Sequence, residues 1–515
     1  MARWICLLAY ALCCALWWTR AAWIPEWDSA IYLLAARSLA SGGGYTYLGS
    51  PFFLRPPGFS WVLSFFVVGP EIPFAHLNLV IMLFAAATVA AIYLAFQKAG
   101  RWTALALALL SGTCPLFVRN FNLILSEFPF AALLFLSLAL VDGERPDGDG
   151  SGDAVAAGAG WWRSVASGLA LAGALYMRTA ALVLAPAMLL AAVFPGGEDR
   201  GRTSRGGTGW SGSKRLYRLV PAAIGVLLAI PWLVVSSRAS ARAEKPSEQM
   251  LLFNYATAMG HVDPGDPASL LVSPGGWAGR IAGNGAALGR DLADTVLFTS
   301  AGWAAALVGL VLLSGLGLSF GRGPRVLDCF ALLYAAVLVT YFAYDRRLVM
   351  PLAPFVYHYA LVAVAAVWRW GFSRIGRAAL PAGIFLVVLF GMNIARLPAA
   401  LRPETWTASG GGTQGQVWKD IDTVVSWVRA NTPDGAVLLC SRAPIVSLLT
   451  GRRAYTYRFR RSRDPLTKYG IDYVIFDAEA TPDLRQLAAA RAERCWSLPP
   501  SRPGAEITAC RIERR

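Results

Sequence analysis

The sequence has few charged residues for its length. Only 15% of its 515 residues are Asp, Glu, Lys or Arg, whereas 56% are hydrophobic and the mean hydropathy is +0.49. A soluble globular domain usually carries about 25% charged residues. The scarcity excludes a cytosolic enzyme, a fibrous protein and a disordered chain. The chain instead contains repeated apolar stretches of about 17–25 residues, the length that crosses about 30 Å of hydrocarbon. The sequence therefore predicts a membrane protein.

Patterns that bind metals or cofactors are also missing. The three histidines are far apart, and the eight cysteines include no pair with the CxxC spacing of metal or redox sites. We therefore expect no cofactor, and the sequence leaves a requirement for a divalent metal open. Cys440, Cys495 and Cys510 lie in a polar C-terminal region, where one disulfide could form if that region faces an oxidising compartment. Whether Cys495 pairs with Cys510 stays open at this point.

We predict about eleven transmembrane helices, one for each apolar stretch of sufficient length. They are expected near residues 4–20, 74–96, 102–118, 123–141, 162–177, 179–194, 218–236, 295–319, 326–343, 348–368 and 378–395. The first stretch follows Arg3 and has the composition of a signal peptide, but no convincing cleavage site follows it. An odd number of spans places the two ends of the chain on opposite sides of the membrane.

The formal net charge of +16 could indicate a nucleic-acid binder, but the distribution of the charge favours a membrane explanation. Lys and Arg gather in the loops predicted to be cytoplasmic, whereas the short loops on the other side carry only Arg119, Arg178, Arg346 and Arg347. Membrane proteins normally show this excess in their cytoplasmic loops. We therefore predict a multi-pass protein of the bacterial inner (cytoplasmic) membrane, with its N-terminus in the cytoplasm and no nucleic-acid partner.

Two domains are predicted. Residues 1–395 form a transmembrane domain, and its long outer loops at 23–59 and 237–293 contain the aromatic residues and prolines of ordered loops. Residues 396–515 form a small extracytoplasmic α/β domain. In it, GAVLLC and IDYVIFD have the apolar runs of buried strands, and TPDLRQLAAARAERC has a helical pattern after a Thr cap. The predicted fold class is an α-helical polytopic membrane protein with a small C-terminal α/β domain.

The first outer loop contains the most informative segment. A helix is expected to begin near Asp28 and to end at three consecutive glycines, Gly42 to Gly44. One face of it carries an apolar stripe suited to lying on the membrane surface. The stripe consists of Trp27, Ile31, Leu34 and Leu39. Asp28 could simply cap the N–H groups of this helix. Its position at the mouth of a membrane cavity, where a lipid-linked substrate would meet a water-soluble one, favours a functional role.

Several motifs follow one another in the order of a known enzyme family. After the first span, an acid is followed by a tyrosine, a small-residue helix, a Gly-Tyr turn and a Pro-Pro-Gly sequence. A Ser-Glu pair begins the fourth span. An Arg-x-x-x-Pro-x-x-Pro segment begins a late span. The matching residues are Asp28, Tyr32, Ala36, Gly44-Tyr45, Pro56-Pro57-Gly58, Leu125-Ser126-Glu127-Phe128-Pro129 and Arg347 to Pro354. Over most of residues 1–395 the chain resembles the polytopic GT-C-type glycosyltransferases. Among these, it is most similar to bacterial relatives of protein O-mannosyltransferases and lipid A aminoarabinose transferases.

The resemblance implies transfer of a hexose or pentose from a polyprenyl-phosphate-linked donor to an acceptor protein, lipid or glycan on the extracytoplasmic face. Asp28 inherits the position of the catalytic acid, as a general base that takes the proton of the acceptor hydroxyl; such a base contributes about 10²–10⁴-fold to a rate. Glu127 is the second candidate catalytic residue, because the aspartate that relatives often carry in the second outer loop is missing here. Glu127 could instead pair with Arg119 or cap the fourth span.

A departing lipid phosphate needs cationic partners, because guanidinium groups hold phosphate oxygens through paired donors. Four arginines at the predicted outer surface could bind it: Arg55, Arg178, Arg346 and Arg347. Arg178 interrupts an apolar hairpin and therefore needs a buried partner. Arg346 and Arg347 could instead anchor the protein at the membrane surface or pair with Asp345.

The pocket for donor and acceptor is expected to include two aromatic residues and one more acid of the first loop. These residues are Tyr32, Tyr45 and Glu26. Many relatives have two adjacent acids in this loop, whereas here Glu26 and Asp28 are separated by Trp27, which places the two carboxylates on different faces of the helix.

Two other functions fit a polytopic membrane protein. A transporter or flippase of lipid-linked envelope precursors would carry inverted repeats and charged residues at mid-membrane, and the sequence shows neither feature. A scaffold of a cell-envelope complex would not need Asp28 beside a group of arginines. The sequence gives no sign of the sugar, the lipid length, the acceptor or the oligomeric state.

Overall fold

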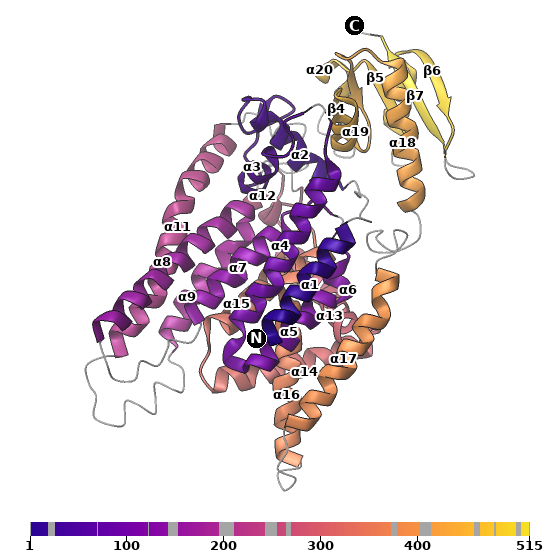
Figure 1. Cartoon of the computed structure of the whole chain (residues 1–515). Coiled ribbons are helices and arrows are strands. Elements are labelled where there is room, and N and C mark those ends of the chain that lie inside the picture. Colours follow the sequence, from indigo (N-terminus) through magenta and orange to yellow (C-terminus); the bar gives the residue numbers. More distant parts are fainter. Residues whose placement is uncertain are drawn as a thin grey trace.

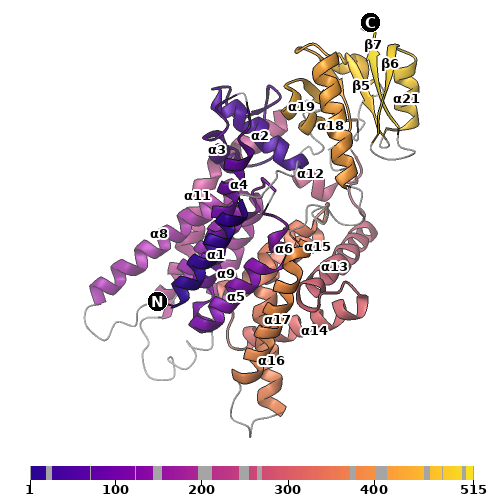
Figure 2. The same cartoon turned by 45° about the vertical axis from the view of Figure 1, so that its right-hand side comes forward.

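A long helical bundle and a small sheet make up the protein (Figure 1). The structure, a computed structural model, describes residues 2–18, 26–69, 71–121, 123–142, 153–194, 211–242, 255–263, 269–371, 379–400, 414–457, 464–477, 480–500 and 506–513. The sheet and its helices lie at one end of the bundle together with the C-terminus. The N-terminus lies toward the other end, and the turned view agrees (Figure 2).

Most of the bundle helices follow the apolar stretches of the sequence, whereas α12 and most of α13 lie in the expected outer loop 237–293. Their bounds are α1 Ala2–Trp18, α4 Phe74–Ala95, η1 Gln97–Ala99, α5 Arg101–Thr113, α6 Pro115–Val118, α7 Glu127–Asp142, α8 Asp153–Met177, η2 Thr179–Val183, α9 Leu184–Val193, α11 Ser211–Arg242, α12 Tyr255–Gly260, α13 Pro274–Leu297, α14 Gly302–Gly321, α15 Val326–Thr340, η3 Arg346–Leu352, α16 Ala353–Gly371 and α17 Ala379–Ala400. Among the described residues, four helices are long and apolar enough to cross a membrane: Phe74–Ala95, Leu219–Arg238, Gly302–Gly321 and Arg346–Gly371.

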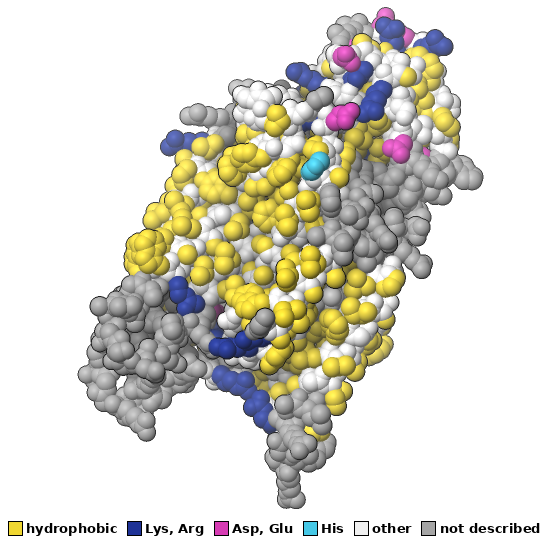
Figure 3. All heavy atoms as spheres, in the orientation of Figure 1, with side chains coloured by type: hydrophobic (Ala, Val, Ile, Leu, Met, Phe, Trp, Pro, Cys, Tyr) yellow, Lys and Arg dark blue, Asp and Glu magenta, His cyan; other side chains and the backbone are white. Residues whose placement is uncertain are grey.

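The surface of the bundle has the character of a membrane protein. Hydrophobic side chains cover its side face, whereas Lys and Arg lie toward its two ends (Figure 3). Large apolar side chains such as Leu313 on α14 and Val387 on α17 are exposed, which is stable only against lipid. The protein is therefore a membrane protein with several helical spans. The exact number of spans and their orientation stay predictions.

Two expected spans differ from the helices that form. The stretch expected at 123–141 becomes helical only from Glu127. The stretch expected at 295–319 is divided between two helices, because Phe298 ends α13 with a left-handed φ of 58° and α14 begins four residues later at Gly302. Most of α13 therefore lies in the segment expected to be an outer loop. Ser273 caps α13 by accepting a hydrogen bond from Gly276 N–H.

The first loop, residues 26–69, folds into a small structure above the bundle. It contains helix α2 (Trp27–Ala40), a two-stranded hairpin of β1 (Thr46–Tyr47) and β2 (Ser50–Pro51), and helix α3 (Gly58–Ser64). The expected end of α2 is confirmed, because Gly42 just beyond it adopts a left-handed φ of 77°.

The apolar stripe of α2 was expected to face the membrane, and this expectation is wrong. Ile31 is only 2% exposed and packs in one cluster with Tyr47 and Phe52 of the hairpin region, with Trp27 and Leu34 against it. The reason is that the hairpin folds back over the first part of the stripe, so that Ile31 packs against protein, while Leu39 lies outside this cluster. Helix α2 is therefore held inside the protein, which fixes the direction of its side chains.

The C-terminal residues form an α/β unit with a five-stranded sheet. Its elements are α18 Gln414–Asn431, β3 Val437–Leu439, α19 Ala443–Thr450, β4 Arg453–Tyr455, α20 Pro465–Tyr469, β5 Tyr473–Phe476, α21 Pro482–Ala489, β6 Ala492–Leu498 and β7 Ile507–Ile512. The strand order is β4-β3-β5-β7-β6, with β3 parallel to β4 and β5 and the other neighbours antiparallel. The two buried strands expected in this region correspond to β3 and β5.

The helix expected over TPDLRQLAAARAERC is shorter than its pattern. Helix α21 ends at Ala489, and the residues that follow form strand β6, which pairs with β7. Cys495 and Cys510 face each other in this pair and form a disulfide. Cross-strand pairing and the disulfide thus outweigh the local helical preference of the segment.

The α/β unit packs directly on the first loop (Figures 1 and 2). Helix α19 lies against α2, and Ile445 and Leu448 of α19 are buried in the same hydrophobic cluster as the bundle. Arg37 of α2 donates a hydrogen bond from Nη1 to the Leu448 carbonyl at 3.1 Å. Helix α2 is therefore enclosed between the hairpin and the C-terminal unit.

Candidate functional site

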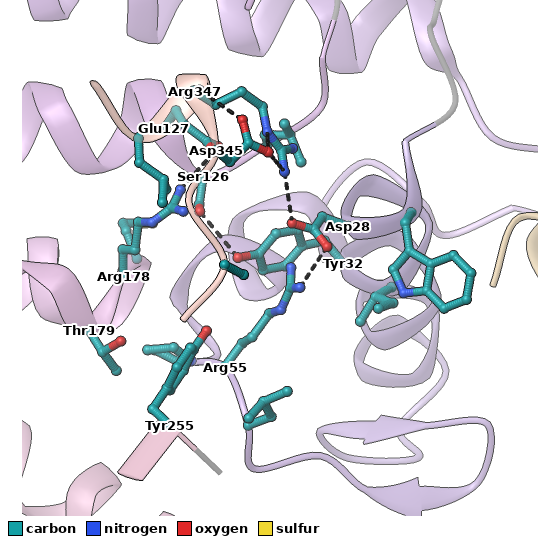
Figure 4. A pocket seen from close by; sticks show the side chains of 18 of the residues that line it. Asp28, Tyr32, Arg55, Ser126, Glu127, Arg178, Thr179, Tyr255, Asp345 and Arg347 are labelled. Atoms are coloured by element: carbon teal, nitrogen blue, oxygen red, sulfur yellow. Dashed lines mark hydrogen bonds and ion pairs between the residues drawn. The ribbon is translucent and has the colours of Figure 1, made fainter. Parts of the chain in front are cut away.

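A cavity of about 400 Å³ lies where the first loop meets the bundle (Figure 4). Its walls come from α2, the segment before α3, the start of α7, the end of α8 with η2, helix α12, and the segment between α15 and α16. Its lining residues are Trp27, Asp28, Ile31, Tyr32, Leu54, Arg55, Pro56, Leu125, Ser126, Glu127, Met177, Arg178, Thr179, Tyr255, Tyr341, Phe342, Ala343, Asp345, Arg347 and Leu348. All three motif regions of the sequence thus meet at one place.

Asp28 bridges two arginines in this cavity. Its Oδ1 accepts a hydrogen bond from Nη2 of Arg55 at 2.6 Å, and its Oδ2 lies 3.5 Å from Nη2 of Arg347 (Figure 4). Burial alone would raise the pKa of the Asp28 carboxyl, but Arg55 and Arg347 outweigh burial and hold the pKa well below its usual range. The carboxylate is therefore ionised at neutral pH and, while both contacts last, is a weak base.

Arg55 is held from several sides. Its guanidinium lies 5.1 Å from the centre of the Tyr32 ring, and its side chain is 13% exposed. Burial would lower the pKa of Arg55, but the nearby Asp28 raises it above its usual value. The hydroxyl of Tyr45 donates to the carbonyl oxygens of Arg55 and Pro56 at 3.1 and 3.2 Å. Tyr45 was expected to line the pocket, but it supports Arg55 from behind the cavity wall.

Arg178 finds its buried partner in Glu127. Nη1 of Arg178 lies 2.7 Å from Oε1 of Glu127, which is the first residue of α7. The other oxygen, Oε2, is buried and has no hydrogen-bond partner among the described residues. Oγ of the neighbouring Ser126 lies 3.1 Å from the Tyr32 hydroxyl, and this hydrogen bond joins the segment before α7 to α2. Glu127 therefore pairs with Arg178 and not with Arg119, the alternative partner considered from the sequence.

Arg346 and Arg347 are neighbours in sequence but point to different places. Arg347 and Asp345 both line the cavity, and Nη2 of Arg347 lies 2.8 Å from Oδ2 of Asp345. Arg346 instead pairs with Asp291 and Asp294 of α13 and does not line the cavity. The two residues lie in a 3₁₀ turn, in which successive side chains are about 120° apart.

Glu26 stands just before α2 and outside the cavity lining. It occupies the N-cap position, but its side chain makes no capping hydrogen bond. Burial raises the pKa of the Glu26 carboxyl, and the nearby Arg347 opposes this increase. It is therefore a neighbour of the cavity rather than part of its wall.

Tyr255 is a site residue that the sequence did not single out. It lies in α12 and lines the cavity, and burial raises the pKa of its hydroxyl above the usual value. The only signal was the aromatic character of the expected outer loop that contains it. No group of three or more His, Cys, Asp or Glu side chains that could hold a metal ion occurs in the described part of the chain.

The charges of the cavity lining are balanced. Three arginines, Arg55, Arg178 and Arg347, face three acids, Asp28, Glu127 and Asp345. Each arginine has an acid within 2.8 Å. An anionic ligand therefore has to compete with an existing ion pair for the guanidinium that it contacts.

The comparison with solved structures confirms that the helical bundle has the GT-C fold. The similar structures include ArnT, an aminoarabinose transferase, from Cupriavidus metallidurans bound to undecaprenyl phosphate. Its TM-score is 0.55 at 14% identity, over 98% of this chain and 97% of that one. They also include the oligosaccharyltransferase AglB from Archaeoglobus fulgidus in complex with an inhibitory peptide and a dolichol-phosphate. Its TM-score is 0.56 at 13% identity, over 96% of this chain and 72% of that one.

The likeness is one of structure only. No family model and no curated protein matches the sequence. At 13–15% identity, the two ArnT structures and AglB share the fold with this chain. Activity and site roles have to be inferred from the chain's own residues.

Proposed function

We propose that this protein transfers a sugar from a polyprenyl-phosphate-linked donor to an acceptor, with the reaction at the cavity around Asp28. The observation that supports this most directly is the Asp28 carboxylate held between Arg55 and Arg347 in a cavity of the GT-C fold. Solved neighbours with this fold carry undecaprenyl phosphate or a dolichol-phosphate. A proton acceptor beside phosphate-binding cations is the chemistry that such a donor requires.

The ion pairs of Asp28 suggest how the base becomes active. When the donor phosphate binds Arg55 or Arg347, that arginine donates some of its hydrogen bonds to the phosphate instead of to Asp28. The negative phosphate also offsets the positive charge of the arginine. The pKa of the Asp28 carboxyl therefore rises, and with it the affinity of Asp28 for a proton. Donor binding therefore turns a weak base into a stronger one at the moment when the base is needed.

The transfer step follows from this arrangement. Asp28 takes the proton of the acceptor hydroxyl, the acceptor oxygen forms a bond to the anomeric carbon, and the bond from that carbon to the phosphate oxygen breaks. The lipid phosphate leaves with the bonding electron pair, and Arg55, Arg178 and Arg347 are placed to stabilise its charge. Glu127 orients Arg178 through their ion pair, which we favour over a direct role in proton transfer.

A second, much smaller hollow of about 20 Å³ suggests where a lipid donor approaches the cavity. It is almost wholly apolar and lies beside the cavity, between α8, η2 and α11. Its lining residues are Leu175, Tyr176, Thr179, Leu182, Ala229, Trp232 and Leu233. Thr179 also lines the main cavity, so the two spaces meet at that residue. We propose that the polyprenyl chain enters here from the lipid, with its phosphate directed toward Arg178.

Two features favour transfer on the extracytoplasmic face. At the end of the bundle opposite the first loop, the charged side chains in view are almost all Lys and Arg, as expected for a cytoplasmic end, whereas the sheet end carries charges of both signs (Figures 1 and 3). The disulfide of Cys495 with Cys510 lies in the unit that packs on the first loop, and disulfides persist in oxidising compartments outside the cytoplasm. A bacterial inner membrane with the cavity facing outward satisfies both.

The test is Asp28→Asn in purified protein reconstituted with a polyprenyl-phosphate sugar and candidate acceptors. We expect the transfer rate to fall by about 10²–10⁴-fold, because the amide cannot accept the acceptor's proton. Glu71→Gln, the same change at an exposed acid, is the matched control and should transfer sugar at the wild-type rate.

Full transfer by the Asp28→Asn variant would remove Asp28 from the mechanism. Movement of the lipid-linked sugar across sealed vesicles, without any glycosylated product from the wild-type protein, would favour a flippase instead.

A further inference from the structure

The Pro-Pro-Gly sequence of the first loop has a structural feature that the proposed reaction does not explain. Gly58, the first residue of α3, lies directly against the last turn of α8. A Cβ atom at this position would stand 2.6 Å from the carbonyl oxygen of Tyr176 and 2.8 Å from its carbonyl carbon. Both are backbone atoms, so no side-chain rotation could relieve the overlap. The position therefore requires glycine for lack of space rather than for its backbone angles.

This contact joins two of the three segments that carry arginines to the cavity. Arg55 lies three residues before Gly58, and Arg178 lies two residues after Tyr176. The two guanidinium groups reach the cavity from different elements (Figure 4). The close approach of the two backbones at Gly58 and Tyr176 therefore sets how near to each other the segments that carry the two arginines can lie.

The other parts of the segment are fixed as well. On one side, Tyr45 holds the carbonyl oxygens of Arg55 and Pro56 through its hydroxyl. On the other side, the Tyr176 hydroxyl donates to the Leu228 carbonyl of α11 at 3.1 Å, which holds the end of α8. With both sides fixed, a displacement at Gly58 passes to Arg55 instead of being absorbed nearby.

We propose that Gly58 and Tyr45 are positioning residues that keep Arg55 at a fixed distance from Arg178, so that both can hold one donor phosphate. The inference deepens the proposed function and rests on it for its catalytic consequence. A side chain at position 58 pushes the segment away from α8, and Arg55 moves with it. Misplacing a phosphate-binding group by about 1 Å can cost a factor of about 10² in rate.

The experiment compares three glycine-to-alanine variants of the full-length protein. Gly58→Ala introduces the overlap with Tyr176. Gly69→Ala adds a methyl group where nothing lies within 4 Å, so it controls for the substitution itself. Gly315→Ala creates a more severe overlap, with the backbone carbonyl group of Tyr359, but at a helix contact outside the cavity lining. It controls for a general loss of packing.

Two readouts separate the inference from the proposed function. The first is the rate at which phenylglyoxal modifies Arg55, measured by mass spectrometry, because Arg55 is only 13% exposed in the intact site. We expect Gly58→Ala to raise this rate several-fold while both controls leave it unchanged. The second readout is the donor KM, which we expect to rise at least tenfold in Gly58→Ala alone, with the acceptor KM unchanged.

An unchanged modification rate of Arg55 in Gly58→Ala would overturn the inference. A raised modification rate in a protein whose wild type neither binds undecaprenyl phosphate nor transfers sugar would support the positioning role and contradict the proposed function. If Gly58→Ala does not accumulate in the membrane, Tyr45→Phe tests the same claim without any overlap. That variant loses one shared hydrogen bond and should raise the donor KM about two- to fivefold; an unchanged donor KM would count against the inference.

Discussion

The ion pair of Arg178 with Glu127 allows a quantitative test, because one of its partners is almost fully buried. Nη1 of Arg178 lies 2.7 Å from Oε1 of Glu127, and the two side chains are 24% and 5% exposed. With an effective dielectric constant of about 20, unit charges at this separation attract each other by about 6 kcal/mol. Desolvation of the two ions cancels much of this energy. Removing only one partner leaves a buried charge alone, which typically costs about 3–5 kcal/mol.

We therefore expect Arg178→Gln to lower the free energy of unfolding by about 3–5 kcal/mol, and the double variant with Glu127→Gln to recover most of the loss. Denaturant unfolding in detergent micelles measures both values. The double variant also separates the stabilising role of Arg178 from its role in binding the donor phosphate. It restores stability but has no cation at position 178, so its donor KM should stay above that of the wild type.

Two results would refute this reasoning. A single Arg178→Gln variant within about 1 kcal/mol of wild-type stability would show that the buried acid does not need its partner. A double variant with the wild-type donor KM would show that Arg178 acts only through its ion pair and does not bind the phosphate.

Two further predictions concern other parts of the chain. Replacing both Cys495 and Cys510 by serine opens a loop with a sequence separation of 15 residues, which should destabilise the protein by about 3 kcal/mol in the same unfolding measurement. The pKa of Asp28 is lower in the folded state than the value of about 3.9 in the unfolded state. The ion pairs of Asp28 therefore contribute stability that is fully present above about pH 3.9 and is lost as the pH falls through the folded-state pKa. We expect the difference in unfolding free energy between wild type and Asp28→Asn to be constant from pH 7 to about 5 and to decrease below about pH 4. A difference that already decreases between pH 7 and 5 would contradict the lowered pKa.

Most of the helical architecture could be predicted from apolar stretches, because each such stretch satisfies its backbone hydrogen bonds locally. The first loop shows how far local signals extend: the helix that begins near Asp28 and ends at Gly42 was predicted, but the partner of its apolar stripe was not. The interruption at Phe298 and the strand that begins at Ala492 were also missed. Both depend on tertiary packing, which overrides local propensity and has no periodic signature in the sequence.

Six of the nine residues predicted for the site line the cavity, but the sequence did not indicate how they pair. Asp28 and Arg55 are 27 residues apart, and nothing local indicates that they touch. Both Arg346 and Arg347 were candidates for the donor phosphate, although only Arg347 belongs to a motif, and the 3₁₀ turn directs only Arg347 into the cavity. Tyr255 belongs to no motif, so only the folded chain could reveal its place in the cavity wall.

The hydrogen bond from Arg37 to the Leu448 carbonyl spans 411 residues of sequence. The ribosome synthesises Arg37 early and Leu448 late. Helix α2, which contains Asp28, is therefore not covered by α19 until most of the chain has been translated. A protein cut short by a premature stop codon after the last bundle helix would insert its spans and yet lack that cover. The cover of α2 can thus form only after helix α19 has been translated.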